Sequence, residues 1–457
     1  MEIQREAQLQ ERLGRQLILF PLPLQGHISP MLQLANILYA KGFSITIVHT
    51  KFNSPNPTNY PHFTFYPIFD GLSESESSPN DIISLLSLLN QNCIVPFQEA
   101  LAQLLADKSG DPIACLISDA ILHFTSAVAK SFNLPRIVLR TGGVSSFLAF
   151  AAFPLLLEKG YIPTQDGRAE EPVVELPPLR VKDLPVIKTS NPEKFYELLA
   201  SMIQETKNSS GLIWNSFEEL EESALTKLRQ DFPIPIFPVG PFHKHFTVSS
   251  SSLIADDTSS ISWLNEQSPN SVIYVGFGSI AAIEEKEFIE IAWGLVNSKL
   301  PFLWVVRPGL VRGAEWIEPL PEGFLEMLNG RGHIVKWAPQ LEVLAHPAVG
   351  AFWTHNGWNS TIESICEGVP MICMPCFTDQ LVNARYVSHV WKVGVQLENG
   401  LDRVNIEQAI KKIMVEKEGE EIRKQVLNLK EKINLCLELG GSSYNSVKSM
   451  VNYIASF

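Results

Sequence analysis

Short apolar strand patterns alternate with helical patterns through the first part of the chain. Apolar runs at residues 17–22, 44–49, 113–118 and 136–139 have the length and β-branched content of buried strands. Residues 29–41, between the first two runs, carry apolar side chains at helical spacing. Strands joined through helices pair in parallel, so this half predicts a parallel sheet with helices on both faces.

The same alternation returns later in the chain. Strand patterns at residues 272–277, 302–306 and 349–353 alternate with helical patterns at residues 284–298 and 359–367. The second half therefore predicts another parallel α/β sheet. Two α/β domains with a cleft between them are the expected architecture, which also fits the length of 457 residues.

The stretch at residues 242–260 has no clear period, and its centre reads VSSSS. A serine-rich segment of this kind is typical of a linker. We therefore expect an N-terminal domain over residues 1–250 and a C-terminal domain that begins at residue 251.

Composition and charge exclude several classes of protein. A net charge of −13 without a basic segment disfavours nucleic acid as a partner. Six cysteines are too few for a disulfide framework in a chain of this length and fit a reducing compartment. The longest apolar stretch, residues 144–157, is shorter than the ~20 residues of a membrane span, and residues 1–16 lack the apolar core of a signal peptide. A soluble, cytoplasmic monomer without a membrane span is expected.

Parallel sheets bind ligands at the carboxyl ends of their strands. In the first half, His27 lies there in a QGH turn, Asp119 ends a strand, and Thr141 follows another. The dipole of the next helix disfavours a protonated imidazole, so His27 could accept a proton. An exposed histidine in a turn and two ordinary helix caps explain the same residues equally well.

In the second half, the sequence GFGSIA follows a strand and resembles a dinucleotide-binding turn. Arg307 stands where such proteins carry an acidic residue, and an arginine would tolerate a 2′-phosphate. An NADP-dependent oxidoreductase is therefore one hypothesis. Cys373 and Cys376 form a CxxC pair with His355 as the only plausible partner, so a buried, inert pair is favoured over a redox or zinc site.

The segment that begins WAPQLEVLAH and ends MPCFTDQ is dense in groups suited to a sugar nucleotide. The indole of Trp337 can stack on a uracil, and residues 354–360 lie between a strand and a helix, where a diphosphate binds well. Glu363 could accept hydrogen bonds from ribose hydroxyls. Asp379 and Gln380 place an acceptor-only carboxylate beside an amide, a combination that suits sugar hydroxyls.

This segment resembles the signature box of plant family 1 UDP-glycosyltransferases. The QGH turn, the LISD strand end, GLIWNSFEELE and the FGS turn also fit that family, so the resemblance covers essentially the whole chain. Within the family, the chain resembles the plant subgroup that includes steviol-glycoside and cytokinin glucosyltransferases. The resemblance implies the GT-B fold, with two Rossmann-like domains facing across a cleft. Residues 1–250 would bind the acceptor, residues 251–441 the UDP-sugar, and residues 442–457 would form a helix packed on the first domain.

Carried over position by position, the resemblance implies a role for each site residue. His27 would be the general base and Asp119 its orienting partner. The donor-binding residues would be Trp337 and Ala338 at the uracil, Gln340 and Glu363 at the nucleoside, Ser279, His355, Asn359 and Ser360 at the diphosphate, and Thr141, Trp358, Asp379 and Gln380 at the sugar. The acceptor pocket would contain Leu24, Ile121, Ser146, Phe150 and Met202, which fit plain core positions equally well. The sequence departs from the family at Asn356, where many members have Cys, and at Gly276, where Ser is common.

The implied reaction is inverting transfer of glucose from UDP-glucose, as co-substrate, to a hydrophobic small molecule such as a terpenoid, phenolic or glycoside. The acceptor group would be a hydroxyl, with a carboxyl, an amine or a sugar hydroxyl as alternatives. No metal is expected, because helix N–H groups and polar side chains can stabilise the leaving UDP. A non-catalytic sugar-nucleotide-binding protein remains a further hypothesis, although it gives His27 and Asp119 no role.

Overall fold

A computed structural model of the chain describes residues 12–73, 82–187, 189, 191–246, 253–398 and 400–457. The chain divides into two compact units. The first unit comprises Met1–Pro154, Ile187–Leu253 and Leu435–Phe457, and the second comprises Leu155–Val186 and Ile254–Asn434. No helix among the described residues is both long and apolar enough to span a bilayer.

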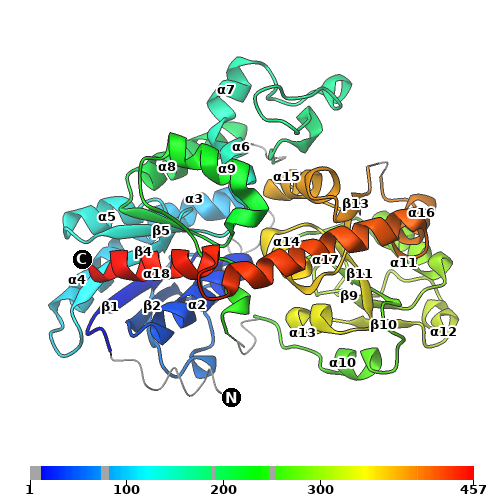
Figure 1. The fold of residues 1–457 in the computed structure, drawn as a ribbon, viewed down its shortest axis with the longest axis horizontal. Coiled ribbons are helices and arrows are strands. Elements are labelled where there is room, and N and C mark those ends of the chain that lie inside the picture. Colours follow the sequence, from blue (N-terminus) through cyan, green and yellow to red (C-terminus); the bar gives the residue numbers. More distant parts are fainter. Residues whose placement is uncertain (1–11, 74–81, 188, 190, 247–252, 399) are drawn as a thin grey trace. The chain divides into compact units, whose positions relative to one another are not determined.

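The first unit is built on a seven-stranded sheet of order β3-β2-β1-β4-β5-β6-β7 (Figure 1). All neighbouring strands pair in parallel. The strands are β1 (Gln16–Phe20), β2 (Ser44–Thr50), β3 (Thr64–Ile68), β4 (Ile113–Asp119), β5 (Arg136–Arg140), β6 (Gly211–Trp214) and β7 (Ile236–Pro238). The helices are α2 (Gln25–Ala40), α3 (Ile82–Asn92), α4 (Ile94–Ala106), α5 (Thr125–Ser131), α6 (Val144–Ala151), α8 (Pro192–Lys207), α9 (Glu218–Asp231) and α18 (Ser442–Ala455), with 3₁₀ turns η1 (Pro57–Asn59) and η5 (Phe242–Lys244).

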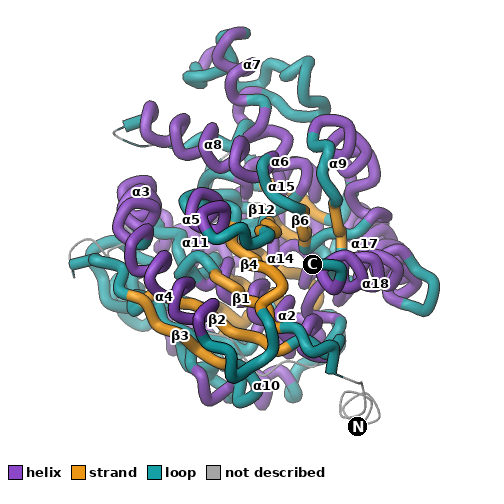
Figure 2. Tube along the Cα trace, turned by 90° about the vertical axis from the view of Figure 1, so that its left-hand side faces the viewer, coloured by secondary structure: helices purple, strands orange, loops and turns teal. Residues whose placement is uncertain are grey.

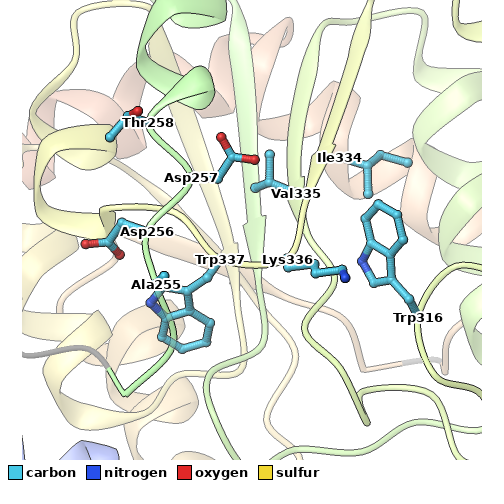
Figure 3. Close-up of a pocket in the computed structure, with 9 residues that line it drawn as sticks. All are labelled: Ala255, Asp256, Asp257, Thr258, Trp316, Ile334, Val335, Lys336 and Trp337. Carbon is cyan, nitrogen blue, oxygen red and sulfur yellow. The ribbon is translucent and has the colours of Figure 1, made fainter.

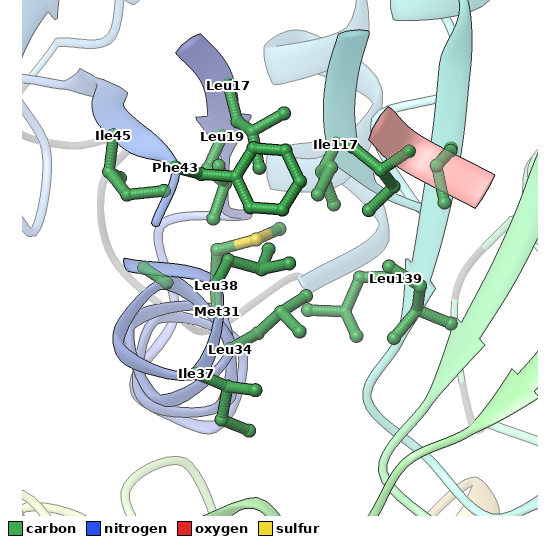
Figure 4. Close-up of a cluster of buried hydrophobic side chains, with 14 of the residues drawn as sticks. Leu17, Leu19, Met31, Leu34, Ile37, Leu38, Phe43, Ile45, Ile117 and Leu139 are labelled. Carbon is green, nitrogen blue, oxygen red and sulfur yellow. The ribbon is translucent and has the colours of Figure 1, made fainter. Parts of the chain in front are cut away.

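Side chains that alternate along β1 divide the core of the first unit into two layers. Leu17 and Leu19 pack on one face against Met31 and Leu34 of α2 (Figure 4). Phe20 points to the other face and stacks on Phe97 of α4, with ring centroids 4.9 Å apart. Figure 2 shows α2 and α4 on opposite sides of the sheet that contains β1.

Helix α18 completes the core of the first unit. Its residues Val447, Met450 and Ile454 are buried in the same cluster as Leu17 and Leu19 of β1. The hydroxyl of Tyr453 donates to the carbonyl oxygen of Ser210 at 2.6 Å. The expected helix over residues 442–457 therefore lies in the core of the first unit, where it packs beside β7 and β4.

The second unit has a six-stranded parallel sheet of order β10-β9-β8-β11-β12-β13 (Figure 1). The strands are β8 (Val272–Gly276), β9 (Phe302–Val305), β10 (Gly332–Val335), β11 (Val349–Thr354), β12 (Met371–Cys373) and β13 (Gly394–Gln396). The helices are α10 (Ser259–Leu264), α11 (Glu285–Ser298), α12 (Phe324–Leu328), α13 (Gln340–Ala345), α14 (Trp358–Glu367), α15 (Asp379–Arg385), α16 (Arg403–Met414) and α17 (Lys417–Leu437), with the shorter turns η3 (Asp166–Arg168), η4 (Val181–Asp183) and η6 (Tyr386–Val390). Helix α7 (Phe153–Glu158) spans the point where the chain passes between units.

The division into units differs from the expected continuous domains in two segments, and the shorter one is residues 435–441, which group with the first unit. Residues 155–186 group with the second unit although they precede residue 250. Ion pairs with Glu398 hold them there, because Arg180 Nη2 lies 2.8 Å from Glu398 Oε1 and Lys182 Nζ lies 3.2 Å from Glu398 Oε2. Such distant ion pairs have no local pattern in the sequence. The centre of the expected linker, residues 247–252, lies outside the described residues.

Candidate functional site

In the first unit, His27 and Asp119 meet at the carboxyl edge of the sheet. Asp119 ends β4 and is almost fully buried, and its Oδ2 lies 2.7 Å from His27 Nδ1. An ionised carboxylate can only accept, so Nδ1 carries the hydrogen and Nε2 presents a lone pair. About a fifth of the His27 side chain remains exposed. The pair can therefore accept a proton from a bound molecule.

Neighbouring groups fix the geometry of this pair. The second carboxylate oxygen of Asp119 accepts a hydrogen bond from the backbone N–H of Ile121 at 2.9 Å. The hydroxyl of Thr141, which follows β5, lies 3.0 Å from His27 Nδ1. Strands β1, β4 and β5 are adjacent in the sheet, which explains why residues far apart in the sequence meet here. Thr141, expected at the sugar, contacts the imidazole in this structure.

The local structure around His27 differs from the expectation. A turn was predicted before a helix that starts at residue 29, but α2 begins at Gln25, so His27 lies in its first turn. Leu24 at the N-cap has no polar side chain, and Pro30 stands inside the helix, so the usual start signals are missing. The side chain of Gln25 instead donates to Ser29 Oγ at 2.6 Å.

The five expected acceptor residues all lie in the first unit. Leu24, Ser146, Phe150 and Met202 are buried, whereas Ile121 is partly exposed. The Ser146 hydroxyl donates to the carbonyl oxygen of Gly143 at 2.9 Å, and the Met202 sulfur accepts from Arg140 Nη1 at 3.0 Å. These contacts serve packing within the protein, so contact with an acceptor stays a prediction.

In the second unit, the expected uracil-binding residues follow β10. Ala338 is buried and Trp337 is partly exposed. Trp337 lines a pocket of about 460 Å³ together with Asp256, Asp257, Lys336 and Trp316, among other residues (Figure 3). The Trp337 carbonyl oxygen accepts a hydrogen bond from the Asp257 N–H at 3.0 Å, which fixes the backbone beside the indole.

Three of the expected donor-binding residues form one hydrogen-bonded cluster. Gln340 Nε2 donates to Glu363 Oε2 at 2.6 Å and to Ser360 Oγ at 3.0 Å. The side-chain amide oxygen of Gln340 accepts a hydrogen bond from the hydroxyl of Tyr274 at 3.3 Å. Tyr274 is buried, and the sequence did not single it out. Burial raises the pKa of Glu363 to about 7 although the Gln340 hydrogen bond favours the ionised form. This carboxyl therefore titrates near neutral pH.

His355 is wedged between two glycines at the end of β11. A Cβ on Gly278 or Gly357 would lie 2.5 or 2.6 Å from atoms of its ring, so only glycine fits at either position. Burial, assisted by the charge of Arg307, lowers the pKa of His355 to about 4, so the ring is neutral at pH 7. Its buried Nδ1 finds no partner among the described residues. A ligand oxygen could pair with it.

The other expected diphosphate residues lie at the same edge of the second sheet. Ser279 follows β8, which pairs with β11, and Asn359 and Ser360 lie in the first turn of α14. Backbone N–H groups at a helix N-terminus favour an anion. Trp358, the first residue of that helix, is buried, with its ring 6.3 Å from that of Trp391.

The two residues expected at the sugar begin α15. The side-chain amide oxygen of Gln380, Oε1, accepts hydrogen bonds from the backbone N–H groups of Cys376 at 2.9 Å and Phe377 at 3.3 Å. Both lone pairs of this oxygen are therefore occupied, and the amide offers a sugar only its NH₂ group, not the donor and acceptor expected from the sequence. The Asp379 carboxylate accepts from the Thr378 hydroxyl at 3.0 Å and from Asn383 Nδ2 at 3.3 Å.

Sequence reasoning missed Asn383. This buried amide also donates to the carbonyl oxygen of Asn356 at 3.0 Å, so it joins the turn after β11 to the start of α15. Its spacing of four residues from Asp379 on one helix was the available signal. Asn356, where many family members have Cys, has φ 61°, a left-handed conformation that Asn tolerates better than most residues.

Two alternative hypotheses from the sequence are wrong in this structure. Arg307 is buried and donates to the carbonyl oxygens of Gly278, Ala281 and Pro308, so the backbone holds its guanidinium instead of a 2′-phosphate. Burial raises the pKa of both Cys373 and Cys376 to about 12, and neither forms a disulfide. Cys373 is buried as expected, whereas Cys376 is exposed, and the raised pKa values keep both thiols protonated at pH 7.

Comparison with known families gives one consistent result. The family described as UDP-glucoronosyl and UDP-glucosyl transferase matches residues 73–430. The chain is 54% identical to UDP-glycosyltransferase 76B1 of Arabidopsis thaliana, covering 96% of this chain and 98% of that protein. It is 50% identical to UDP-glycosyltransferase 76G1 of Stevia rebaudiana over 100% of both chains.

Solved structures agree with these relatives. A UDP-glucose: anthocyanidin 3-O-glucosyltransferase in complex with UDP superposes with a TM-score of 0.85 at 26% identity, covering 97% of this chain and 99% of that one. Phytolacca americana UGT2, complexed with UDP-2fluoro-glucose and pterostilbene, has a TM-score of 0.82 at 26% identity, covering 96% and 100%. The predicted α/β fold with two Rossmann-like parallel sheets, the GT-B class, is confirmed.

Proposed function

The chain belongs to the UDP-glucuronosyl and UDP-glucosyl transferase family, and from that membership we propose that it is an inverting glucosyltransferase for hydrophobic small molecules. It is an enzyme that transfers a glycosyl group from a UDP-sugar. The observation that carries the proposed mechanism is the 2.7 Å contact between His27 Nδ1 and Asp119 Oδ2.

His27 is the general base in this proposal. Its Nε2 takes the proton of the acceptor hydroxyl as that oxygen bonds to C1 of glucose and the bond from C1 to UDP breaks. Asp119 holds the imidazole through Nδ1 and stabilises the imidazolium that forms. A single displacement of this kind inverts the anomeric centre, so an α-linked donor gives a β-linked product.

The leaving diphosphate is stabilised by groups of the second unit. The N-terminus of α14, the hydroxyl of Ser279 and the neutral ring of His355 can donate hydrogen bonds to its oxygens. Asn359 and Ser360 extend this set, and Trp337, Ala338, Gln340 and Glu363 hold the uridine. These donors supply charge stabilisation without a metal ion, which therefore has no role in the proposal.

Glucose is the proposed sugar because of Asp379 and Gln380. The Gln380 NH₂ donates and the Asp379 carboxylate accepts, so the two side chains complement neighbouring hydroxyls of one sugar in a fixed orientation. Trp358 offers no cation for the carboxylate of a glucuronic acid. The glucosyl-type donors in the solved relatives support this choice.

The proposed acceptor is a terpenoid, a phenolic or a glycoside with an apolar body. Apolar side chains at Leu24, Ile121, Phe150 and Met202 support this class, as does the pterostilbene bound by the Phytolacca enzyme. Six cysteines without a disulfide support the cytoplasm as the compartment.

One assay separates the three functions considered. The purified protein is incubated with UDP-glucose and a panel of phenolic and terpenoid alcohols, and UDP release and product mass are measured together. Release that requires an acceptor and yields a product heavier by one hexose supports glucosyl transfer. Acceptor-dependent NADPH oxidation would instead support an oxidoreductase, and UDP binding without turnover would support a binding protein.

A further inference from the structure

Arg307 connects two loops at the carboxyl edge of the second sheet. It follows β9 and is only 8% exposed. Its Nε donates to the carbonyl oxygen of Gly278 at 3.0 Å, its Nη1 to that of Pro308 at 3.0 Å, and its Nη2 to that of Ala281. The guanidinium thus fixes the loop that follows β8 to the loop that follows β9.

The positive charge of Arg307 has no counter-charge in the described part of the chain. No carboxylate there forms an ion pair with it, and the one favourable charge near it would be a thiolate at Cys376, whose raised pKa keeps the thiol neutral. Burial lowers the pKa of Arg307 to about 10, which leaves the group charged at pH 7. Buried charges in native proteins are normally paired, because desolvation is costly.

The uncompensated charge lies directly behind the residues assigned to the diphosphate. Gly278, whose carbonyl accepts from Arg307, packs against the ring of His355. In a trans peptide the C=O and N–H groups point in opposite directions. The bond from Arg307 to the Gly278 oxygen therefore directs the N–H of Ser279, in the same peptide unit, away from the guanidinium and towards the opposite side of the turn.

We propose that Arg307 is a positioning residue for the donor diphosphate, which it serves by directing the Ser279 N–H and by supplying a positive charge that the bound diphosphate neutralises across the turn. This inference rests on the proposed function, because it takes the diphosphate to bind beside Ser279 and His355. In this proposal Arg307 acts through the turn and not by contact with the ligand, because its Nε, Nη1 and Nη2 each donate to a backbone carbonyl. Loss of an ordinary structural arginine would weaken the binding of UDP, UMP and uridine equally, whereas loss of Arg307 should weaken ligand binding more as the negative charge of the ligand increases.

The test compares ligands that differ in phosphate number. Calorimetry gives dissociation constants for UDP, UMP and uridine with the wild type, R307M, R307K and R312M. The last variant is a matched control, because Arg312 is a largely exposed arginine of the same unit whose Nε lies 3.1 Å from Glu284. Thermal unfolding of each variant checks that it is folded.

R307M should weaken UDP binding at least about tenfold and uridine binding less than about twofold, with UMP in between. R307K, which keeps the charge but not the planar fork, should lose less UDP affinity than R307M, and R312M should match the wild type. Equal losses for uridine and UDP, or no loss for UDP, would overturn the proposal. If R307M does not fold, the losses of UDP affinity and uridine affinity are compared for R307K instead, and the proposal expects the larger loss for UDP. Wild-type protein that binds no UDP would overturn the proposed function together with this inference, whereas wild-type binding with unaltered variants overturns the inference alone.

Discussion

The carboxylate of Asp119 contacts His27 Nδ1 at 2.7 Å although 92 residues separate the two in sequence. Adjacent strands β1 and β4 bring them together, and the Ile121 N–H holds the second carboxylate oxygen. The pair is therefore fixed by the sheet rather than by mobile side chains. In the proposed function, an orientation of this kind would prepare His27 Nε2 to act as a base before a substrate binds.

Removal of the base should slow the reaction without weakening donor binding. H27A is expected to lower kcat by ~10²–10⁴, because general-base catalysis contributes about that much. Steady-state kinetics and the calorimetric Kd for UDP measure the two effects. H62A is the control, since His62 is exposed in the same unit and stacks on Tyr39 at 5.2 Å. Near-wild-type turnover of H27A on a hydroxyl acceptor would remove His27 from the mechanism.

Asp119 should act through His27. D119A is expected to reduce kcat/KM less than H27A, and the double variant should be no slower than H27A alone, because residues that act as one unit are not additive. The measurement is a double-mutant cycle on kcat/KM, with circular dichroism to show that the loss of the Ile121 hydrogen bond leaves the fold intact. Losses that multiply would contradict a working dyad.

Glu363 gives the stability of the protein a pH dependence. Its pKa is about 7 in the folded protein against 4.5 as the ordinary value, so between these limits the folded state binds more protons than the unfolded state. Stability contributed by the protonated group is therefore lost as pH rises from about 4.5 to about 7. We expect E363Q to remove about 1–3 kcal/mol of this dependence. Urea unfolding of both proteins at pH 5 and pH 8 measures it, and identical slopes against pH would show that Glu363 is not the titrating group.

The donor should be selected at Asp379 and Gln380. A buried polar group left unpaired costs ~1–3 kcal/mol, so UDP-glucose should exceed UDP-galactose and UDP-glucuronate by at least about tenfold in kcat/KM. Competition between equimolar donors, followed by product mass and sugar analysis, tests this. A product that is mainly galactosylated or glucuronidated would refute the donor assignment while leaving glycosyl transfer in place.

Chelation should not affect activity. The α14 N-terminus, Ser279 and His355 are the proposed stabilisers of the leaving group, so turnover in EDTA should equal turnover in buffer. Loss of activity that magnesium or manganese restores would show that a metal shares this role.

Local patterns in the sequence were sufficient to predict two parallel sheets and strands β1, β2, β4, β5, β8, β9 and β11, because buried parallel strands are short continuous apolar runs. Strands β3, β6, β7, β10 and β13 were not predicted, and most of them are only three or four residues long, which is too short for a clear pattern. The segment from Trp337 to Gln380 also predicted a sugar-nucleotide site from the sequence alone, because the chemistry of its residue types suits a nucleotide. The start of α2 was missed because Leu24 cannot cap a helix and packing after β1 determines where it begins. Arg307 was misread for a different reason, since its partners are backbone carbonyls that no residue type reveals.

The core of the first unit can be completed only after helix α18 has been synthesised. The core that surrounds Leu17 and Leu19 of β1 includes Val447, Met450 and Ile454, so these strands cannot be fully covered until the ribosome has made the last helix. The second unit, whose residues end at Asn434, is complete earlier. During translation the sheet that positions His27 and Asp119 is thus the last to close, and a chain truncated before residue 442 exposes an apolar surface that the longer chain buries.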